Sequence, residues 1–270
     1  MAGVSIGGLF LAGFIPGVLI GLGLMLTIYI HSFLPGFPEL RRKSGKFSLL
    51  PVLKSARKVW VALLAPVIIL GGILGGIFTA TEAGVVACIY SFVVTYFLYR
   101  TIKLKDLYEI ILDAAITTTM VVGIISVAGG LGWLLAYLDF NDVVMNFIVR
   151  LSPSPLIVLL SLLAIMLVLT MFIESLAVLI ILVPVAVYVS NAFGFNPYYF
   201  GLLMVMATQI GATTPPVAVL LFVATSIAET TYDETIRYCY PFILTLIGVM
   251  LLVVFFPPLA SWIPNTFLGP

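Results

Sequence analysis

The sequence predicts an all-α polytopic membrane protein, and three observations support this fold class. Hydrophobic residues make up 63% of the 270 positions and charged residues only 9%, whereas soluble domains carry about 25% charged residues. The apolar residues form long runs that approach the roughly 20 residues a helix needs to cross a bilayer. The charges gather in short segments between these runs. We therefore expect a lipid bilayer around the chain and no nucleic acid as a partner.

The positions of Lys and Arg predict the orientation of the chain. Seven of the twelve basic residues lie between Arg41 and Lys58, and three more lie between Arg100 and Lys105. Short loops rich in Lys and Arg face the cytoplasm in membrane proteins. Both basic segments are therefore predicted to be cytoplasmic.

Residues 1–37 are predicted to hold the first transmembrane segment, with an apolar run from Ile6 to Leu34. The opening MAGVSIGGLF lacks the basic residues that begin a secretory signal peptide, so we expect it to correspond to sequence from the middle of a protein. Residues 38–60 are predicted to form a basic loop and an interfacial amphipathic helix. The apolar face of this helix comprises Val52, Leu53, Ala56, Val59 and Trp60.

Residues 61–153 are predicted to form scaffold helices. The stretch Val59–Tyr99 is long enough for two crossings, with a turn at Thr79–Glu82. Thr79 and Glu82 have the spacing of a capping box, which we prefer to an ion-site role for Glu82. A short amphipathic piece, Leu107–Asp113, and a crossing, Ala114–Leu138, follow, and the acidic loop Asp139–Asp142 is expected outside.

Residues 154–228 are predicted to form the transport unit, which begins with a hairpin. Its two apolar arms are Pro155–Thr170 and Ser175–Ser190. Arms of sixteen residues extend about 24 Å, which is short of the ~30 Å hydrocarbon core. A re-entrant hairpin with Glu174 at a tip near the middle of the membrane therefore fits better than two full crossings.

A helix with a gap in the middle is predicted to follow the hairpin. Its halves are Pro197–Gly211 and Pro215–Ala228, and Asn196–Pro197 is a favourable start for a helix. Residues 229–270 then hold a second capping-box match, Thr231–Glu234, and a final crossing, Thr235–Pro257. With these crossings the basic segments stay inside and the C-terminus lies outside.

The hairpin tip and the helix break carry the polar residues expected to form a transport site. Discontinuous helices in secondary transporters aim their N-termini at anions, while unwound carbonyls coordinate the driving cation. We expect Thr214 to cap a half-helix that starts at Pro215, and the freed carbonyls of Gln209–Thr213 to suit sodium. A plain proline kink satisfied by neighbouring helices is the alternative. The predicted sodium ligands are Glu174, Ser175, Gln209, Gly211, Thr213 and Thr214, and the predicted substrate contacts are Thr214, Pro215 and Pro216.

Three stretches resemble the large membrane subunit of the tripartite ATP-independent periplasmic (TRAP) transporters. They are GGIFTATEAG (Gly75–Gly84), MFIESLAVLIILVPV (Met171–Val185) and GFNPYYFGLLMVMATQIGATTPPVAVLLFVA (Gly194–Ala224). The resemblance runs from about Leu9 to the C-terminus. Two departures are Ala80, where the family usually has Pro, and Ala218, where it usually has Gly, which leaves the backbone beyond the break less free.

The resemblance implies an elevator-type ion-transporter fold built from two inverted repeats, each a re-entrant hairpin plus a broken helix. This chain resembles the second repeat alone, so we expect the C-terminal half of such a subunit, from a split gene or a fragment. We expect an inverted-repeat site to need both halves, and hence no transport by this chain alone.

The implied activity is sodium-driven, ATP-independent uptake of an organic acid across the bacterial inner membrane. The implied substrates are a C4-dicarboxylate, sialic acid or a similar carboxylate. The implied partners are a small (Q-type) membrane subunit, a periplasmic (P-type) binding protein and the missing N-terminal half. Sodium is the coupling ion, and no cofactor is expected.

Other classes of protein are less favoured. A related ion-coupled carboxylate transporter without a binding protein, and a channel, stay open as alternatives. An enzyme is not expected, because the only histidine is His31 and neither HExxH nor GxSxG occurs.

Overall fold

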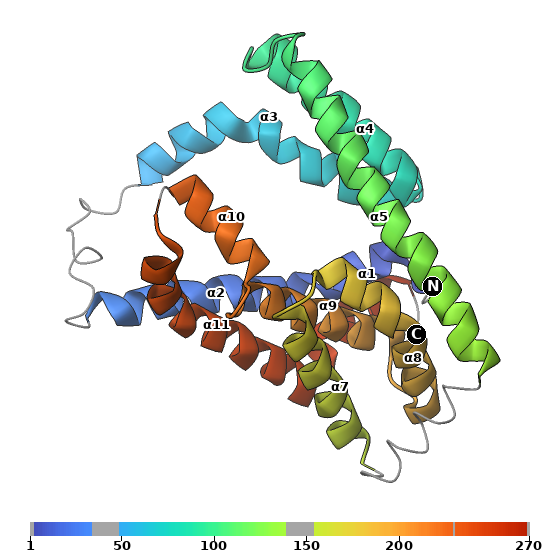
Figure 1. Ribbon diagram of the computed structural model, residues 1–270. Helices are drawn as coiled ribbons and strands as arrows, with labels where there is room; N and C mark the ends of the chain where they lie inside the picture. The colour runs from blue at the N-terminus through green and yellow to red at the C-terminus, as the bar shows by residue number, and fades with distance from the viewer. Residues whose placement is uncertain (1–2, 34–48, 139–153, 229, 269–270) are drawn as a thin grey trace. The chain divides into compact units, whose positions relative to one another are not determined.

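The computed structural model describes residues 3–33, 49–138, 154–228 and 230–268, and within them the chain is helical with no strand. Two compact units are present: residues 35–119, and residues 1–34 together with 120–270. The boundary between them falls within one helix, α5 (Asp106–Tyr137). Figure 1 labels the helices. The all-α prediction is confirmed for the described residues.

The first predicted crossing is formed by two consecutive helices. Ser5 accepts a hydrogen bond from the Gly8 amide and so caps α1 (Ile6–Ala12). Gly13 separates α1 from α2 (Phe14–Ser32). Together they give an apolar stretch of 27 residues that is long enough to span a membrane.

Residues 35–119 contain a helical hairpin that differs in one respect from the prediction. Helix α3 (Leu49–Leu74) is one continuous helix of 26 residues. The predicted interfacial helix is therefore not a separate element but the first turns of α3. Nothing in the sequence between Trp60 and Ala65 breaks a helix, so hydrogen bonding continues through it.

The turn after α3 confirms the predicted capping box. The Thr79 amide donates to Glu82 Oε2 at 2.8 Å, and the Glu82 amide donates to Thr79 Oγ1 at 3.3 Å. These two bonds start α4 (Ala80–Val93), which continues as a π-helix, η2 (Val94–Leu98). The carboxylate of Glu82 is thus occupied by the cap, which agrees with the structural role preferred for it.

Helix α5 is longer than predicted. The separate amphipathic piece expected at Leu107–Asp113 is the first two turns of a single helix of 32 residues. It starts at Asp106, whose carboxylate accepts a hydrogen bond from the Lys103 amide. The loop Asp139–Asp142 and most of the basic loop lie outside the described residues.

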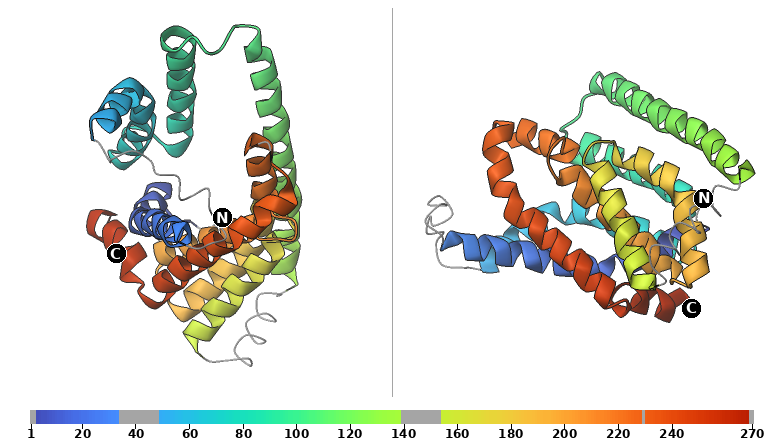
Figure 2. Two further views of the ribbon diagram at one scale, coloured as in Figure 1. Left: turned by 90° about the vertical axis from the view of Figure 1, so that its left-hand side faces the viewer. Right: turned by 60° about the horizontal axis from the view of Figure 1, so that its bottom comes forward.

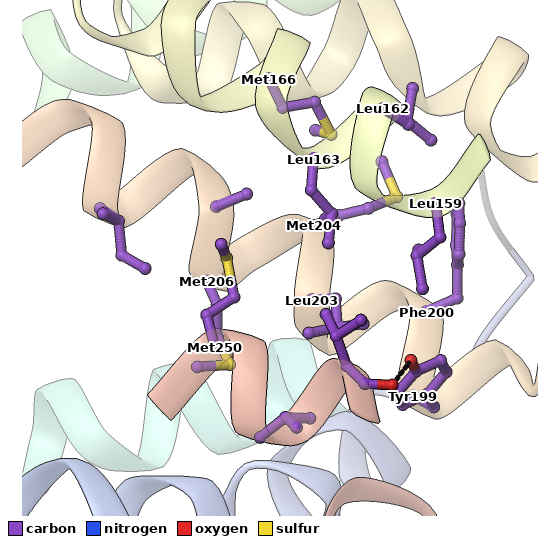
Figure 3. Packing of buried hydrophobic residues seen from close by; sticks show 14 of the residues in the cluster. Leu159, Leu162, Leu163, Met166, Tyr199, Phe200, Leu203, Met204, Met206 and Met250 are labelled. Atoms are coloured by element: carbon purple, nitrogen blue, oxygen red, sulfur yellow. Dashed lines mark hydrogen bonds between the residues drawn. The ribbon is translucent and has the colours of Figure 1, made fainter. Parts of the chain in front are cut away.

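The larger unit is built around a hairpin and a helix that lies beside it. Helices α7 (Pro155–Thr170) and α8 (Ser175–Phe193) form the hairpin, and both contact α9 (Pro197–Thr213). Figure 2 shows the two arms beside α9. Leu159 lies next to Phe200 and Leu163 next to Met204 in Figure 3, so α7 and α9 run in the same direction.

The second arm of the hairpin is longer than expected. Helix α7 has the predicted bounds, but α8 continues to Phe193 and has 19 residues. At 1.5 Å per residue it extends about 28 Å, which is long enough for a crossing. The argument from arm length therefore applies to α7 only. Gly194, with φ +68°, ends α8 because a left-handed residue closes a helix at its C-terminus.

Three further helices complete this unit: α10 (Val219–Ala228), α11 (Tyr232–Phe255) and α12 (Pro258–Leu268). The start of α11 agrees with the predicted position of Thr231 as N-cap, although its hydroxyl makes no capping hydrogen bond. Helix α12 was not predicted. It packs on α1, α2 and α9, and Asn265 accepts a hydrogen bond from the side chain of Asn196 at the start of α9.

Helices α2 and α11 lie side by side and run in opposite directions. Thr27 and Thr245 are hydrogen-bonded at 2.6 Å. A Cβ at Gly23 would meet Thr245 and Val249, so positions earlier in α2 face positions later in α11. The predicted order of crossings has the same antiparallel relation.

Candidate ion and substrate site

The hairpin tip begins where α7 ends at Thr170. The Thr170 hydroxyl donates to the carbonyl oxygens of Met166 and Leu167 at 2.8 and 3.0 Å. A threonine hydroxyl that bonds back to its own helix satisfies itself without water. On the α7 side of the tip, the Thr170 hydroxyl is therefore satisfied by hydrogen bonds within α7.

Glu174 closes the other side of the tip as the N-cap of α8. Its Oε2 accepts the Ala177 amide at 2.9 Å, and its Oε1 accepts the Ser175 hydroxyl at 3.3 Å. A carboxylate at this position also compensates the positive end of the helix dipole. Glu174 is exposed and Ser175 is half-buried. Glu174 thus places a carboxyl group at the tip, held by two hydrogen bonds.

The helix break lies between α9 and α10 and is longer than predicted. Helix α9 continues to Thr213, and α10 begins only at Val219. The peptide bond between Pro215 and Pro216 is cis, and Ala218 has a left-handed φ of +48°. Thr214 is the C-cap of α9, where its hydroxyl donates to the Ile210 carbonyl at 2.6 Å.

The expectation that Thr214 caps a half-helix starting at Pro215 is therefore wrong. A residue that precedes proline is disfavoured in the α conformation, and both Thr214 and Pro215 precede one. The helical hydrogen bonds resume at Ala218, whose carbonyl accepts the amides of Leu221 and Phe222. Five residues, Thr214–Ala218, separate the two half-helices.

The carbonyls expected to be free for an ion are in part occupied. The Gln209 and Ile210 carbonyls accept the Thr213 hydroxyl at 3.1 and 2.8 Å, and the Gly211 carbonyl accepts the Thr214 amide at 2.9 Å. The last two carbonyls of α9, those of Ala212 and Thr213, do not accept their usual helical hydrogen bonds. The usual donor to Ala212 would be the amide that Pro216 lacks, and the usual donor to Thr213 would be the Val217 amide, which bonds elsewhere.

The hairpin tip and the helix break meet, as the sequence predicted. The Val217 amide in the break donates to the carbonyl oxygen of Met171 in the tip at 3.3 Å. A Cβ at Gly211 would collide with the Thr170 hydroxyl and the Leu167 carbonyl, so only glycine permits this approach of α9 to α7. Of the predicted site residues, Gly211 and the segment Thr213–Pro216 thus adjoin the tip that carries Glu174, whereas Gln209 is exposed one turn before the break.

One functional candidate, Tyr232, was missed by the sequence reasoning. Its hydroxyl donates to the Pro216 carbonyl at 2.9 Å, and its ring stacks on Phe222 of α10 with centroids 4.5 Å apart. Tyr232 is sixteen positions after Pro216, across a complete helix. No local pattern signals such a contact.

The oxygen atoms at the junction are of the kind that hard cations prefer as ligands. The described residues contain no group of three or more His, Cys, Asp and Glu side chains placed to hold a metal ion. The oxygens at the junction are backbone carbonyls and threonine hydroxyls, which are hard ligands.

Most of the chain is similar to a known family of membrane proteins. Residues 1–259 match the family model described as "Tripartite ATP-independent periplasmic transporter, DctM component". The chain belongs to this family. The resemblance noted in the three sequence motifs is thereby confirmed. The chain is a membrane protein with five helices, within the described residues, that are long and apolar enough to cross a bilayer.

Several curated relatives match nearly all of this chain. It is 34% identical over 269 residues to a sialic acid TRAP transporter large permease protein of Vibrio cholerae, with 100% of this chain and 62% of the relative covered. It is 35% identical over 261 residues to a C4-dicarboxylate TRAP transporter large permease protein of Pseudomonas aeruginosa, with 97% and 60% covered.

A third relative is named for a different substrate. The chain is 33% identical over 269 residues to an isethionate TRAP transporter permease protein of Oleidesulfovibrio alaskensis, with 99% of this chain and 41% of the relative covered. The chain spans about three fifths of the length of the first two relatives. The family is one of transporter permeases.

Proposed function

We propose that this chain is a permease component of a sodium-driven, ATP-independent transporter that imports an organic acid across the bacterial inner membrane. The observation that carries the proposal is the meeting of the hairpin tip and the helix break, through the bond from the Val217 amide to the Met171 carbonyl. In secondary transporters, interrupted helices that meet within the membrane form the sites of the substrate and the coupling ion.

The sodium ion is proposed to lie at the end of α9. The Ala212 and Thr213 carbonyls lose their usual helical donors, and the hydroxyls of Thr213 and Thr214 are next to them. A carbonyl oxygen has a second lone pair, so Gly211 can also contribute through an oxygen that already accepts one hydrogen bond. Glu174, held by Ser175 and the α8 cap, supplies negative charge from the tip.

The anionic group of the substrate is proposed to lie at the start of α10. Two helix N-termini face the junction of tip and break, those of α8 and α10. The α8 terminus already holds the Glu174 carboxylate, so its dipole is compensated. The α10 terminus offers amides beyond Ala218 to an anion. Thr214, Pro215 and Pro216 then line the approach to it.

The proposed substrates share an anionic group. Three relatives are named for sialic acid, a C4-dicarboxylate and isethionate, which are carboxylates or a sulfonate. The proposed partners are a periplasmic binding protein that delivers the substrate, a small membrane subunit, and the remainder of a large permease. In this proposal the binding protein contributes part of the recognition of the acid. The permease site then needs only to recognise the negative charge of the acid.

The test is uptake of labelled acids in proteoliposomes that contain this chain together with those partners. We expect uptake that rises with external sodium, needs the binding protein and does not need ATP. Uptake that persists without the binding protein would point to an ion-coupled carboxylate transporter of another type. A sodium-independent current would point to a channel. Either result would contradict the proposal.

A further inference from the structure

The break between α9 and α10 is held from both sides through one peptide group. The Val217 amide, which donates to the Met171 carbonyl, and the Pro216 carbonyl, which accepts from the Tyr232 hydroxyl, belong to the same peptide bond. The Pro216–Val217 peptide bond is trans. In a planar trans peptide the N–H and C=O groups point in opposite directions. The hairpin tip and α11 are thus connected across a single rigid plane.

The ring of Tyr232 is itself fixed in place. It stacks on Phe222 of α10 at an interplanar angle of 14°. Its hydroxyl also lies 3.5 Å from the Val217 carbonyl, a longer second contact. With its ring held by α10 and its backbone in the first turn of α11, the hydroxyl has little freedom to leave the Pro216 carbonyl.

The break has few other means of fixing its own backbone. Pro215 and Pro216 have no amide, so the Thr214–Ala218 segment contains only three backbone donors. One of these, at Thr214, bonds back to α9. The orientation of the Pro216–Val217 peptide therefore depends on its two outside partners. Hydrogen bonds at the two ends of one peptide also polarise each other and strengthen together.

We propose that Tyr232 is a positioning residue for the transport site: it orients the Pro216–Val217 peptide, and through it sets the distance between the hairpin tip and the end of α9. The tip carries Glu174, and the end of α9 carries the Ala212 and Thr213 carbonyls. The contribution of Tyr232 to sodium binding rests on the proposed function, whereas its hold on the peptide does not.

The first test is hydrogen exchange of the purified chain in lipid nanodiscs. Tyr232→Phe keeps the ring and its stacking but removes the hydroxyl. We expect the amides of the 214–218 segment to exchange about fivefold faster or more, because loss of one hydrogen bond changes an opening equilibrium by about that factor. Tyr240→Phe, the same change at a half-exposed tyrosine two turns further along α11, should leave this segment unchanged.

A second variant distinguishes a local change at the break from misfolding of the whole chain. Phe222→Leu removes the stacking partner but keeps the hydroxyl, and it should raise exchange of the same segment with an unchanged elution profile. Unaltered exchange in folded Tyr232→Phe protein, or an equal rise in Tyr240→Phe, would overturn the proposal.

The second test is sodium-dependent uptake in the complete transporter. Tyr232→Phe should raise the half-saturating sodium concentration severalfold and leave the maximal rate at high sodium largely intact, because the ligands are present but misplaced. A lower maximal rate with unchanged half-saturation would contradict the positioning role. Wild-type uptake that ignores sodium would instead refute the proposed function and leave the exchange result standing.

Discussion

At the scale of single residues, two glutamates in apolar surroundings have different expected roles. Glu82 and Glu174 both accept backbone amides at helix starts. Glu82 belongs to a reciprocal capping box with Thr79. Glu174 lies at the hairpin tip, three residues after Met171, which bonds to the break. Of the two, Glu174 is the one that belongs to the hairpin tip in contact with the break.

Glu174→Gln should raise the half-saturating sodium concentration of uptake by about three- to tenfold, since a unit charge about 4 Å from an ion is worth on the order of 1 kcal/mol when water screens it, and Glu174 is exposed. Folding should change little, because an amide oxygen can still accept the Ala177 amide. The matched control is Glu82→Gln, which keeps a capping box and should leave sodium dependence unaltered. If uptake depended on sodium concentration in the same way for both variants and the wild type, the role of Glu174 would be limited to capping α8.

Ala218 provides a prediction about the backbone of the break. Its φ of +48° lies in the left-handed region and its side chain is fully buried. A left-handed conformation costs an L-residue about 1–2 kcal/mol, and glycine avoids that cost but loses a buried methyl worth roughly 0.8 kcal/mol. Glycine is also more flexible when unfolded, which costs roughly 0.5–1 kcal/mol. Ala218→Gly should therefore change stability by less than about 1 kcal/mol.

Ala218→Val is the contrasting substitution. A β-branched side chain at a left-handed φ adds strain, and extra methyl groups at a closed site cost typically 1–3 kcal/mol. The midpoint of thermal unfolding in detergent should fall clearly for the valine variant and hardly for the glycine variant. If the valine variant were as stable as the wild type, the break would have to accommodate a larger side chain at position 218 without strain.

At the scale of elements, the contact between α7 and α9 depends on one glycine. Gly211→Ala would place a Cβ against the Thr170 hydroxyl and the Leu167 carbonyl, and a backbone oxygen cannot move aside cheaply. We expect the hairpin to separate from α9, with a loss of about 1–3 kcal/mol and weaker sodium binding.

The control is Gly248→Ala in α11, where a Cβ meets nothing within 4 Å. That change should be neutral, or stabilising by up to about 1 kcal/mol through helix propensity. Thermal unfolding and sodium titration of both variants would separate the two cases. A Gly211→Ala protein with wild-type stability and sodium affinity would mean that the hairpin and α9 are not closely packed.

At the scale of the whole molecule, the ends of several crossings gather together. Asn196 at the start of α9 contacts Asn265 in α12, and a Cβ at Gly8 in α1 would meet Tyr198. The start of the first crossing, the start of α9 and the C-terminal helix therefore lie on the same side. The predicted topology places all three outside and the segment Arg100–Lys105 inside.

Cysteine labelling tests this orientation in a protein whose native Cys88 and Cys239 are replaced by alanine. Thr266→Cys in α12 should react with an impermeant thiol reagent added from the periplasm, and Thr101→Cys, before α5, should react only after the membrane is permeabilised. Both positions are exposed, so access to the side chain does not confound the comparison. The reverse pattern would invert the topology.

The sequence by itself determined the elements whose ends are satisfied locally. The capping box of α4 and the Asn196 cap of α9 follow from donors and acceptors within three residues of each other. Helix α7 begins at Pro155, a residue favoured in the first turn of a helix. The apolar runs likewise determined the membrane class, because no soluble fold can bury so much apolar surface. The pairing of the tip with the break was predicted from their shared polarity in an apolar chain.

Only the tertiary structure decided how the break is built. Two prolines signalled a gap, but where α10 resumes depends on Ala218, and the Pro216–Val217 peptide is oriented by Met171 and Tyr232, residues 46 and 15 positions from Val217 in the sequence. The presence of α12 also escaped local patterns. Packing and hydrogen bonds between distant segments decide such features, and their partners are adjacent only after the chain has folded.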